Sequence, residues 1–237
     1  MNDSIHGGLR VCQSTPLVQL QDRGRFGCRH LGVTQGGALD WLSMGAPGGF
    51  AGERQLGSLA TVAREGLGGP RADGKALAAG DSLGWLADGA RPRALPLPSE
   101  RIMDCTGEAR LELILGAQIG DFPAMSLFDA FNSDWQVDTR ADRMGVRLLG
   151  PRLECRQQSM ISEGIALGAV QVPPDGQPIV LLNDRQSIGG YPRLGALAPL
   201  ALARLAQCLP GQPVRLLPTV QEAAHREHRR LLAAWDA

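Results

Sequence analysis

The chain has 237 residues, which is enough for one large domain or two smaller ones whose cores need no metal ion or disulfide. Lysine plus arginine and aspartate plus glutamate both number 24, so the formal net charge is zero. That balance argues against a broad electrostatic surface for nucleic acid or an anionic membrane. We therefore expect the partners to be proteins and small molecules.

Two further features bear on location. No apolar stretch reaches the roughly 20 residues of a membrane span, and the N-terminal segment MNDSIHGGLR lacks an apolar signal core. The five cysteines are widely spaced and form no Cys-x-x-Cys pair, so we expect reduced thiols in a cytoplasmic protein.

The first chemically notable segment is a polar loop that begins with Gln21, Asp22 and Arg23. Glycines follow at Gly24 and Gly27, where a turn or a close backbone approach is favoured. The loop is either a substrate- or nucleotide-binding loop or a structural turn that joins two strands.

The overall composition predicts a mainly β protein with a few helices. Glycine (31) and proline (16) recur along the chain and most apolar runs between them are short. Pro92, Pro96 and Pro98 form the best linker, because repeated prolines stiffen a chain and cannot continue a strand ladder. We place the boundary there and predict a shortened N-terminal β-rich unit over residues 1–95 and a C-terminal unit over residues 96–237.

A hairpin is predicted in the second unit. Residues 169–172 and 178–182 are apolar and rich in β-formers, and residues 173–176 (PPDG) suit a reversing turn. Five polar residues, 183–187 (NDRQS), follow the second strand and precede Gly189 and Gly190. The segment is either a binding edge or a hairpin followed by a solvated loop.

Two Asp-Arg steps are the candidate catalytic residues, Asp142 with Arg143 and Asp184 with Arg185. An arginine fork can clamp a carboxylate or phosphate, and a neighbouring aspartate can orient that fork. The alternative is that each aspartate caps a turn while its arginine packs at the surface. The candidate substrate- or nucleotide-binding residues, besides the N-terminal loop, are Gln171, Gln177, Gln186, Gly189, Gly190 and Tyr191.

Two helices are predicted near the C-terminus. Leu194, Leu197, Leu200, Leu202 and Leu205 recur at broadly helical spacing before a stop at Pro210 and Gly211. Thr219 and Glu222 then fit a capping box at the start of a last helix that runs toward Trp235.

Several kinds of site are not indicated. Lys75, the only lysine, lies in DGKAL, which is neither a phosphate-binding loop nor the AMKM-like site of biotin attachment. His225 and His228 lie in HREHRR, a solvated charged face, so no metal site is predicted. The sequence thus predicts neither a Walker-type ATP site nor covalent biotin on this chain.

Four segments together resemble one family. They are LQDRGRFGCRHLGVTQGGALD (residues 20–40), RQLGSLATVAREGLGG (54–69), ADRMGVRLLG (141–150) and SEGIALGAVQVPPDGQPIVLLNDRQSIGGYPRLG (162–195). The family is that of allophanate hydrolase subunit 2, also described as biotin-dependent carboxyltransferase family proteins and as the C subunit of 5-oxoprolinase. The resemblance implies tandem cyclophilin-like β-barrels. The first barrel is expected to be incomplete, because residues 40–44 run straight into residues 45–50, where members of the family have many more residues.

The resemblance also implies a function. It points to one component of ATP-dependent 5-oxoprolinase, active only in complex, which opens 5-oxo-L-proline to L-glutamate with the 5-oxoprolinase B subunit (KipI-like) and A subunit. ATP with Mg would be the cofactor. Two alternatives remain open: the carboxyltransferase component of a urea carboxylase and allophanate pathway, and a non-catalytic regulatory partner of the KipI-like protein.

Overall fold

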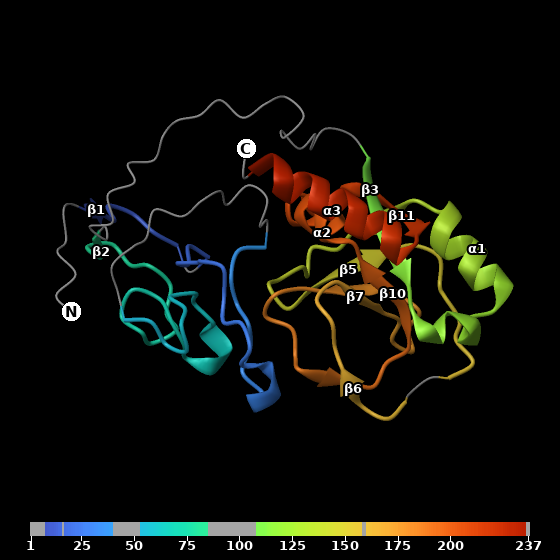
Figure 1. Cartoon of the computed structure of the whole chain (residues 1–237), viewed down its shortest axis with the longest axis horizontal. Coiled ribbons are helices and arrows are strands. Elements are labelled where there is room, and N and C mark those ends of the chain that lie inside the picture. Colours follow the sequence, from blue (N-terminus) through green and yellow to red (C-terminus); the bar gives the residue numbers. More distant parts are fainter. Residues whose placement is uncertain (1–7, 16, 40–52, 85–107, 158–159, 236–237) are drawn as a thin grey trace. The chain divides into compact units, whose positions relative to one another are not determined.

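The structure is a computed structural model that describes residues 8–15, 17–39, 53–84, 108–157 and 160–235. The chain divides into two compact units, Met1–Pro96 (unit 1) and Leu97–Ala237 (unit 2) (Figure 1). The prolines of the expected linker and the junction where the first unit is expected to be shortened both lie outside the described residues.

Unit 1 is built mostly of turns. Its described elements are the strands β1 (Gly8–Arg10) and β2 (Ser82–Gly84), which pair antiparallel, and the 3-10 helices η1 (Arg29–Leu31) and η2 (Ala63–Glu65). The described residues of unit 1 form no closed barrel. A small apolar cluster of Leu20, Leu59 and Leu83, with Leu77 against it, supplies its core.

Unit 2 contains a closed barrel of seven strands in the order β10-β3-β11-β4-β5-β8-β7. The prediction of a mainly β fold with a few helices is confirmed. The elements are β3 (Ala109–Leu115), η4 (Ala117–Asp121), α1 (Ala124–Asn132), β4 (Trp135–Val137), β5 (Gly145–Leu149), β6 (Glu163–Gly164), β7 (Ala169–Gln171), β8 (Ile179–Leu181), β9 (Ile188–Gly189), β10 (Arg193–Leu197), α2 (Pro199–Ala206), β11 (Pro213–Thr219) and α3 (Gln221–Trp235).

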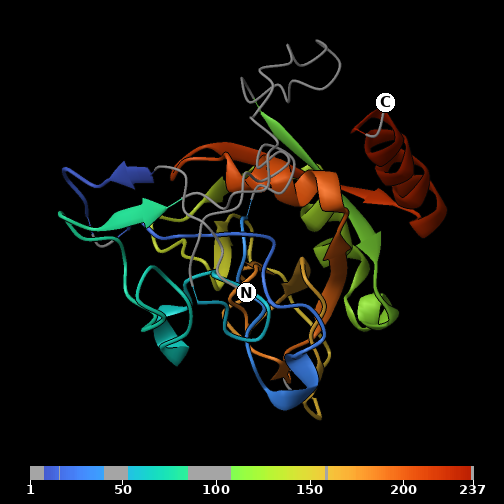
Figure 2. The ribbon, with the colours of Figure 1, turned by 60° about the vertical axis from the view of Figure 1, so that its left-hand side comes forward.

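Burial alternates along the strands, which separates the side chains of the barrel interior from those of its outer face. In β3, Leu111 and Leu113 are fully buried, whereas Arg110 and Glu112 between and beside them are less so. In the barrel, β3 runs parallel to β11, and the other pairs are antiparallel. Register partners on neighbouring strands point to the same side of the sheet. Figure 2 gives a second view of the ribbon. The interior is filled by the buried side chains of Leu111, Leu113, Trp135, Val137, Val146, Leu148, Val170, Val180, Leu197, Val214 and Leu216.

The two predicted C-terminal helices are present, but the residues at which they begin differ from the prediction. Leu194 and Leu197 belong to β10, and α2 begins at Pro199, whose fixed φ suits the first helical turn. Thr219 ends β11, and the amides of Ala223 and Ala224 donate to the carbonyl of Val220, so Val220 and not Thr219 is the residue that precedes and caps α3. Pairing with β3 keeps Leu197 in β10 and Thr219 in β11, so neither residue belongs to the following helix.

Candidate functional site

The predicted hairpin is confirmed. Strands β7 and β8 pair antiparallel, with Val170 opposite Val180 and Gln171 opposite Ile179. The amide of Gly176 donates to the carbonyl of Pro173 at 2.9 Å, and Gly176 has φ +75°, which closes the turn. The polar segment after β8 therefore leaves the barrel at a defined point.

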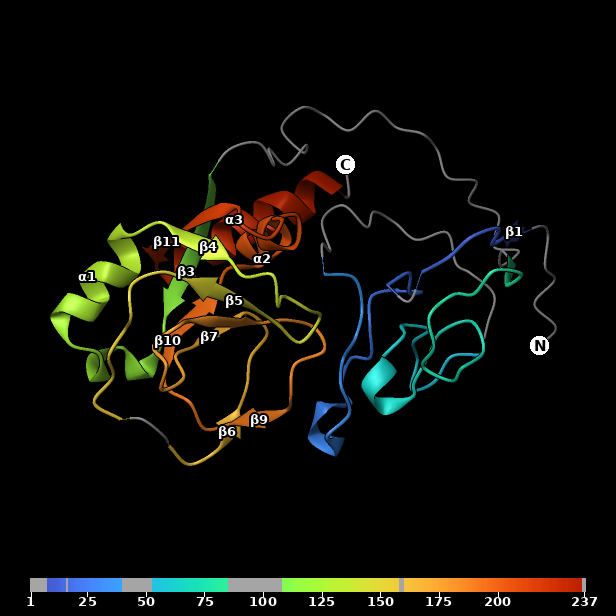
Figure 3. The same ribbon diagram turned by 180° about the vertical axis from the view of Figure 1, so that it is seen from behind.

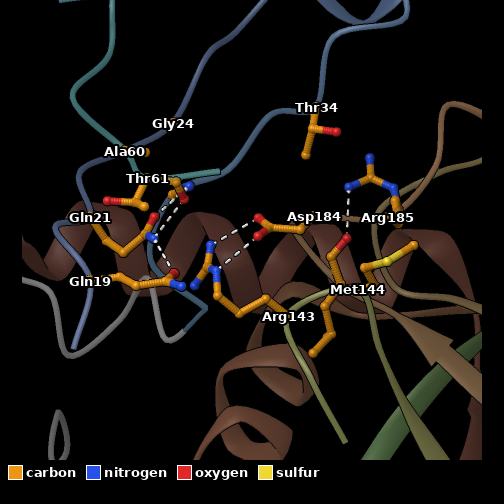
Figure 4. Close-up of polar contacts among 12 residues, drawn as sticks. Gln19, Gln21, Gly24, Thr34, Ala60, Thr61, Arg143, Met144, Asp184 and Arg185 are labelled. Carbon is orange, nitrogen blue, oxygen red and sulfur yellow. Dashed lines mark hydrogen bonds and ion pairs between the residues drawn. The ribbon is translucent and has the colours of Figure 1, made fainter. Parts of the chain in front are cut away.

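The first Asp-Arg step and the second are joined by an ion pair. Arg143 donates from Nε and Nη2 to the two carboxylate oxygens of Asp184, each at 3.0 Å (Figure 4). Both side chains are largely shielded, at 23% and 13% exposed. The backbone amide of Asp184 also donates to the carbonyl of Arg143 at 2.9 Å. This bidentate pair fixes the start of the 183–191 segment against the loop before β5.

Asp142 has a different environment. Its Oδ1 accepts hydrogen bonds from the amides of Met144 and Gly145, at 2.8 and 3.0 Å. This is the turn-capping arrangement that was the alternative to a catalytic role. Its geometry shapes the start of β5.

Arg185 lies inside the protein, at 3% exposed. Its Nε donates to the carbonyl of Ile165 at 3.3 Å and its Nη1 to that of Leu182 at 3.2 Å. A buried guanidinium that donates to backbone carbonyls holds the loop in one conformation. Asn183, two residues earlier, is also buried, with 7% of its surface exposed. Arg185 is thus placed to position its neighbours.

The two candidate glutamines on the hairpin differ sharply. Gln177 accepts from the amide of Gly150 at 2.9 Å and donates back to its carbonyl at 3.2 Å, so its side chain closes the end of β5. Gln171 is 2% exposed, and its Nε2 is a buried donor for which the described residues provide no acceptor. Buried polar groups normally have a partner, which makes Gln171 the most unusual side chain of the segment.

The glycine pair allows close approach of protein segments. A Cβ at Gly189 would lie 2.5 Å from Ile165 Cδ1 and 3.0 Å from Gln171 Nε2, and one at Gly190 would lie 2.6 Å from the carbonyl oxygen of Met160. Tyr191 is 43% exposed. Gln186 is partly buried.

The candidate loop of unit 1 is tightly bonded to its own unit. Gln21 donates from Nε2 to the carbonyl of Thr61 at 3.0 Å and to Gln19 Oε1 at 3.3 Å, and its Oε1 accepts from the amide of Gly37 (Figure 4). Asp22 accepts from the amide of Gly24 at 2.8 Å, from Ser58 Oγ at 2.6 Å and from the amide of Leu59 at 2.9 Å. Arg23 is exposed.

Sequence patterns did not reveal the most buried charge in this loop. Arg25 is 0% exposed, and it donates from Nε to the carbonyl of Gln55 at 3.2 Å and from Nη2 to that of Ala60 at 2.7 Å. Gly68 is required beside it, because φ is +68° and a Cβ would lie 2.0 Å from the Ala60 oxygen. Arg23 and Arg25 look alike in sequence, since each stands beside Gly24.

A cavity of about 230 Å³ lies elsewhere in unit 2. Its lining includes Arg152, Glu154 and Cys155, together with Pro173 and Pro174 of the hairpin turn. Burial raises the pKa of the Cys155 thiol, which keeps it protonated and weakly nucleophilic near neutral pH. None of the predicted site residues lines this cavity.

Comparison with known proteins now decides the family. A family model described as "Carboxyltransferase domain, subdomain A and B" matches residues 31–218, well over half of the chain. The chain belongs to the carboxyltransferase domain family. The resemblance seen in the four sequence segments is therefore confirmed.

Two curated members of this kind are the 5-oxoprolinase C subunits of Escherichia coli and of Haemophilus influenzae. Each is 32% identical to this chain, over 170 and 179 residues that cover 71% and 75% of it. The same alignments cover 53% and 56% of those proteins, so the chain spans about half the length of these curated relatives. Urea amidolyase of Saccharomyces cerevisiae is 24% identical over 244 residues, which cover 93% of this chain and 13% of that protein.

Solved structures agree with the carboxyltransferase domain fold. The urea amidolyase of K. lactis matches 99% of this chain and 20% of its own, with a TM-score of 0.81 and 18% identity, which shows the fold alone. The structure of TTHA0988 matches 89% of this chain and 55% of its own, with a TM-score of 0.70 and 26% identity.

The resemblance implies ATP with Mg, which would be held by carboxylates and cationic side chains. Within the described ranges, no group of three or more His, Cys, Asp or Glu side chains converges to hold a metal ion. Asp184 is engaged by Arg143, and Lys75 lies 3.5 Å from Asp73 with 75% of its side chain exposed. Mg with a nucleotide commonly uses only one or two protein carboxylates beside the phosphates, so ATP with Mg stays a prediction and no step is assigned to it on this chain. Among the described helices, none is long and apolar enough for a membrane span.

Proposed function

We propose that this chain is one component of an ATP-dependent 5-oxoprolinase, active only in complex with the 5-oxoprolinase B subunit (KipI-like) and A subunit. The observation that carries the proposal is the 32% identity to two 5-oxoprolinase C subunits over most of this chain. ATP with Mg, bound in the complex, would supply the phosphoryl group that makes a stable lactam susceptible to hydrolysis. The chain is proposed to act in the cytoplasm.

In this proposal the 183–191 segment faces the substrate. Asp184 and Arg143 hold its first residues through their bidentate pair, Asp142 shapes the adjoining turn, and Arg185 anchors it from inside. A substrate-facing loop must be held in one conformation, because small displacements of reacting groups lower the rate strongly. Gln186, Gly190 and Tyr191 complete the proposed surface.

The proposal is tested by mixing this chain with its two cognate partner proteins and measuring 5-oxo-L-proline-dependent ATP hydrolysis and glutamate formation. Each of the three proteins is omitted in turn. Activity that needs this chain supports the proposal, whereas a stable complex that has no activity supports the regulatory alternative. Activity that is unchanged when the chain is omitted overturns it.

A matched pair of variants tests the segment itself. Arg143→Gln breaks the pair with Asp184, and Arg147→Gln breaks a similar Arg-Asp pair with Asp175 away from the segment. We expect kcat to fall about tenfold or more for Arg143→Gln, since the loop loses its fixed position. Arg147→Gln is expected to keep the parental kcat, and equal losses in the two variants would count against a substrate-facing loop.

The second candidate is the carboxyltransferase component of a urea carboxylase. The family description and the 24% identity to urea amidolyase favour it. Such a component needs a separate biotin carrier, because Lys75 lacks a biotin-attachment motif. Transfer of carboxylate from added carboxybiotin to urea supports this candidate, and its absence in an otherwise active complex excludes it.

A further inference from the structure

Two oppositely charged side chains, Arg152 and Glu154, line the cavity of about 230 Å³ in unit 2. Leu153, which lies between them in the chain, is 2% exposed, whereas both charged residues are exposed. Residues two apart in an extended chain leave it on the same side, about 7 Å from each other. The cavity therefore offers a guanidinium and a carboxylate to one small molecule.

In the part of the chain that the structure describes, these two charges are not neutralised by the protein itself. Arg152 donates from Nη2 to the carbonyl of Pro174 at 3.3 Å, and it forms no ion pair with a described carboxylate. The carboxylate of Glu154 likewise has no described cationic partner. By contrast, Arg147 is paired with Asp175 of the hairpin turn. Arg152 and Glu154 thus keep their charges available for a ligand.

The hairpin turn holds Arg152 in place. Gly176 has φ +75°, and a Cβ there would lie 2.5 Å from Arg152 Cγ, so the arginine stem packs directly over this glycine. The amide of Leu153 donates to the carbonyl of Gly176 at 3.0 Å. A side chain that is positioned before a ligand arrives loses less conformational freedom when the ligand binds.

Two neighbouring elements hold the rest of the charged stretch. The amide of Glu154 donates to Ser126 Oγ in α1 at 2.9 Å, and the amide of Arg156 donates to the carbonyl of Asp121 in η4 at 2.9 Å. Figure 3 shows this stretch, drawn in yellow after β5, as it runs past α1. The backbone that carries both charges is therefore anchored at both ends.

The other lining residues limit the size and polarity of a ligand. Val172, which is 3% exposed, contributes apolar surface together with Pro173 and Pro174, and Gln157 contributes a neutral amide. Sites for drug-sized ligands measure roughly 300–1,000 Å³, so a cavity of about 230 Å³ suits a smaller metabolite. The lining favours a small molecule that carries both charges and a short apolar part.

We propose that this cavity binds a small zwitterionic α-amino acid, with Arg152 pairing with its carboxylate and Glu154 with its ammonium group. Hydrogen bonds between ionised groups are stronger than neutral ones, and the arginine fork matches the geometry of a carboxylate. A ligand that has a carboxylate alone pairs with Arg152 but is repelled by Glu154. The two side chains together therefore select zwitterions over anions.

L-Glutamate is the probe, and this choice rests on the proposed function. Hydrolysis of 5-oxo-L-proline opens the lactam and turns its amide nitrogen into an ammonium group. The substrate thus carries a carboxylate alone, whereas the product carries both charges, and its second carboxylate can accept from the Gln157 amide. The proposed site distinguishes product from substrate, and none of residues 183–191 lines it.

The test is an NMR titration of the ¹⁵N-labelled full chain in which the backbone amide signals of Leu153 and Glu154 are followed. L-Glutamate, glutarate, which lacks the ammonium group, and 5-oxo-L-proline are added at equal ionic strength. We expect a saturable shift with L-glutamate and about tenfold weaker binding of the other two, since each loses one charged pairing. No saturable shift with L-glutamate, or equal affinity for glutarate, overturns the proposal.

Variants assign the two pairings to their side chains. Arg152→Gln is expected to weaken L-glutamate binding about tenfold. Glu154→Gln should weaken it by a similar factor and also abolish the preference for L-glutamate over glutarate, an effect that a general loss of structure does not produce. The control is Arg156→Gln, which removes the same charge from the same stretch at a residue that is not part of the described cavity lining. An equal loss of binding in Arg156→Gln contradicts the site.

The inference and the proposed function can fail separately, because binding is measured on this chain and turnover on the reconstituted complex. If Arg152→Gln and Glu154→Gln both bind L-glutamate as the parent does, the site is wrong, whatever the complex catalyses. If the chain binds L-glutamate through both side chains but the complex has no 5-oxo-L-proline-dependent ATP hydrolysis, the site stands and the proposed function is wrong.

Discussion

The two units bury an arginine in the same way but differ in everything that surrounds it. Arg25 in unit 1 and Arg185 in unit 2 are almost fully buried, and each donates to two backbone carbonyls. In unit 2 the arginine supplements a closed seven-stranded barrel with an apolar interior. In the described part of unit 1 the only ladder is the short β1–β2 pair.

The difference shows two ways to satisfy backbone polar groups. Unit 2 pairs its carbonyls and amides in ladders, whereas unit 1 uses the side chains of Gln21, Asp22, Arg25 and Gln55 for many of them. A turn-rich unit has few ladder partners, so each of these side chains bonds segments far apart in sequence. Unit 1 should therefore be sensitive to polar substitutions and unit 2 to apolar ones.

The largest effect is expected for Trp135→Ala in unit 2. Trp135 is 0% exposed, it packs on Gly150, and its Nε1 donates to the carbonyl of Ala130 at 3.1 Å. Truncation of a buried tryptophan costs about 4 kcal/mol of unfolding free energy. The loss of unfolding free energy is measured by urea denaturation with hydrogen exchange as the readout. Gln136→Ala, on the exposed side of β4, is the control. Equal losses for the two variants would contradict the barrel interior.

The next largest effect is expected for Arg25→Met, which should lower the unfolding free energy of unit 1 by about 3 kcal/mol. The change removes the donor of the Ala60 carbonyl and leaves the Gln55 carbonyl with only the Ser58 amide, and a lost buried pairing costs about 1–3 kcal/mol. Hydrogen exchange should show faster exchange in unit 1 amides and unchanged exchange in the barrel. The neighbouring exposed residue provides the control, Arg23→Met. If Arg23→Met destabilises unit 1 as much, buried bonding is not the cause.

A smaller effect, about 1–2 kcal/mol, is expected for Asp22→Asn. The variant keeps an oxygen for the Gly24 amide and Ser58 Oγ, which share Oδ1, but places an NH₂ group opposite the Leu59 amide, which donates to Oδ2. Thermal unfolding measures it, with Glu53→Gln, an exposed carboxylate of the same unit, as the reference. A loss of stability no larger than that of Glu53→Gln would contradict a stabilising role for the hydrogen bonds of Asp22 in unit 1.

The smallest predicted effect is a pH dependence in unit 2. Hydrogen bonds from the Arg140 side chain, and then from its backbone amide, lower the pKa of Asp138 from 3.8 to about 2. Because the folded pKa lies below the unfolded one, this stabilisation is complete above pH 4 and is lost as the pH falls toward 2. The difference in urea stability between the parent and Asp138→Asn should therefore shrink across that window. A difference that stays constant from pH 5 to pH 2 would contradict the pairing.

Local chemistry explains which predictions from sequence were accurate. The 169–182 hairpin was recognisable because PPDG suits a turn between two β-forming runs, and the last helix because its charged face continues without a breaker. Leu194 and Leu197 were assigned to a helix because leucine spacing alone cannot distinguish a strand next to a helix from a longer helix. Pairing of β10 with β3 and β7 decided the matter.

The candidate site shows the same division. The sequence singled out Asp142 with Arg143 and Asp184 with Arg185 as candidate catalytic residues, but it could not tell that Arg143 pairs with Asp184 while Arg185 turns inward. It also included Gln171 without indicating its buried donor. The pairing of Arg143 with Asp184 and of Arg185 with Ile165 joins residues 41 and 20 positions apart in the chain.

By itself, the sequence determined the family, the mainly β class, the hairpin and the polar segment after it, because turn residues and strand formers act through neighbouring backbone. Only the tertiary structure decided which polar side chains are enclosed and which acceptors they meet. Burial and hydrogen bonding at Arg25, Gln171 and Arg185 arise from segments brought together by folding, and local sequence carries no record of those distances.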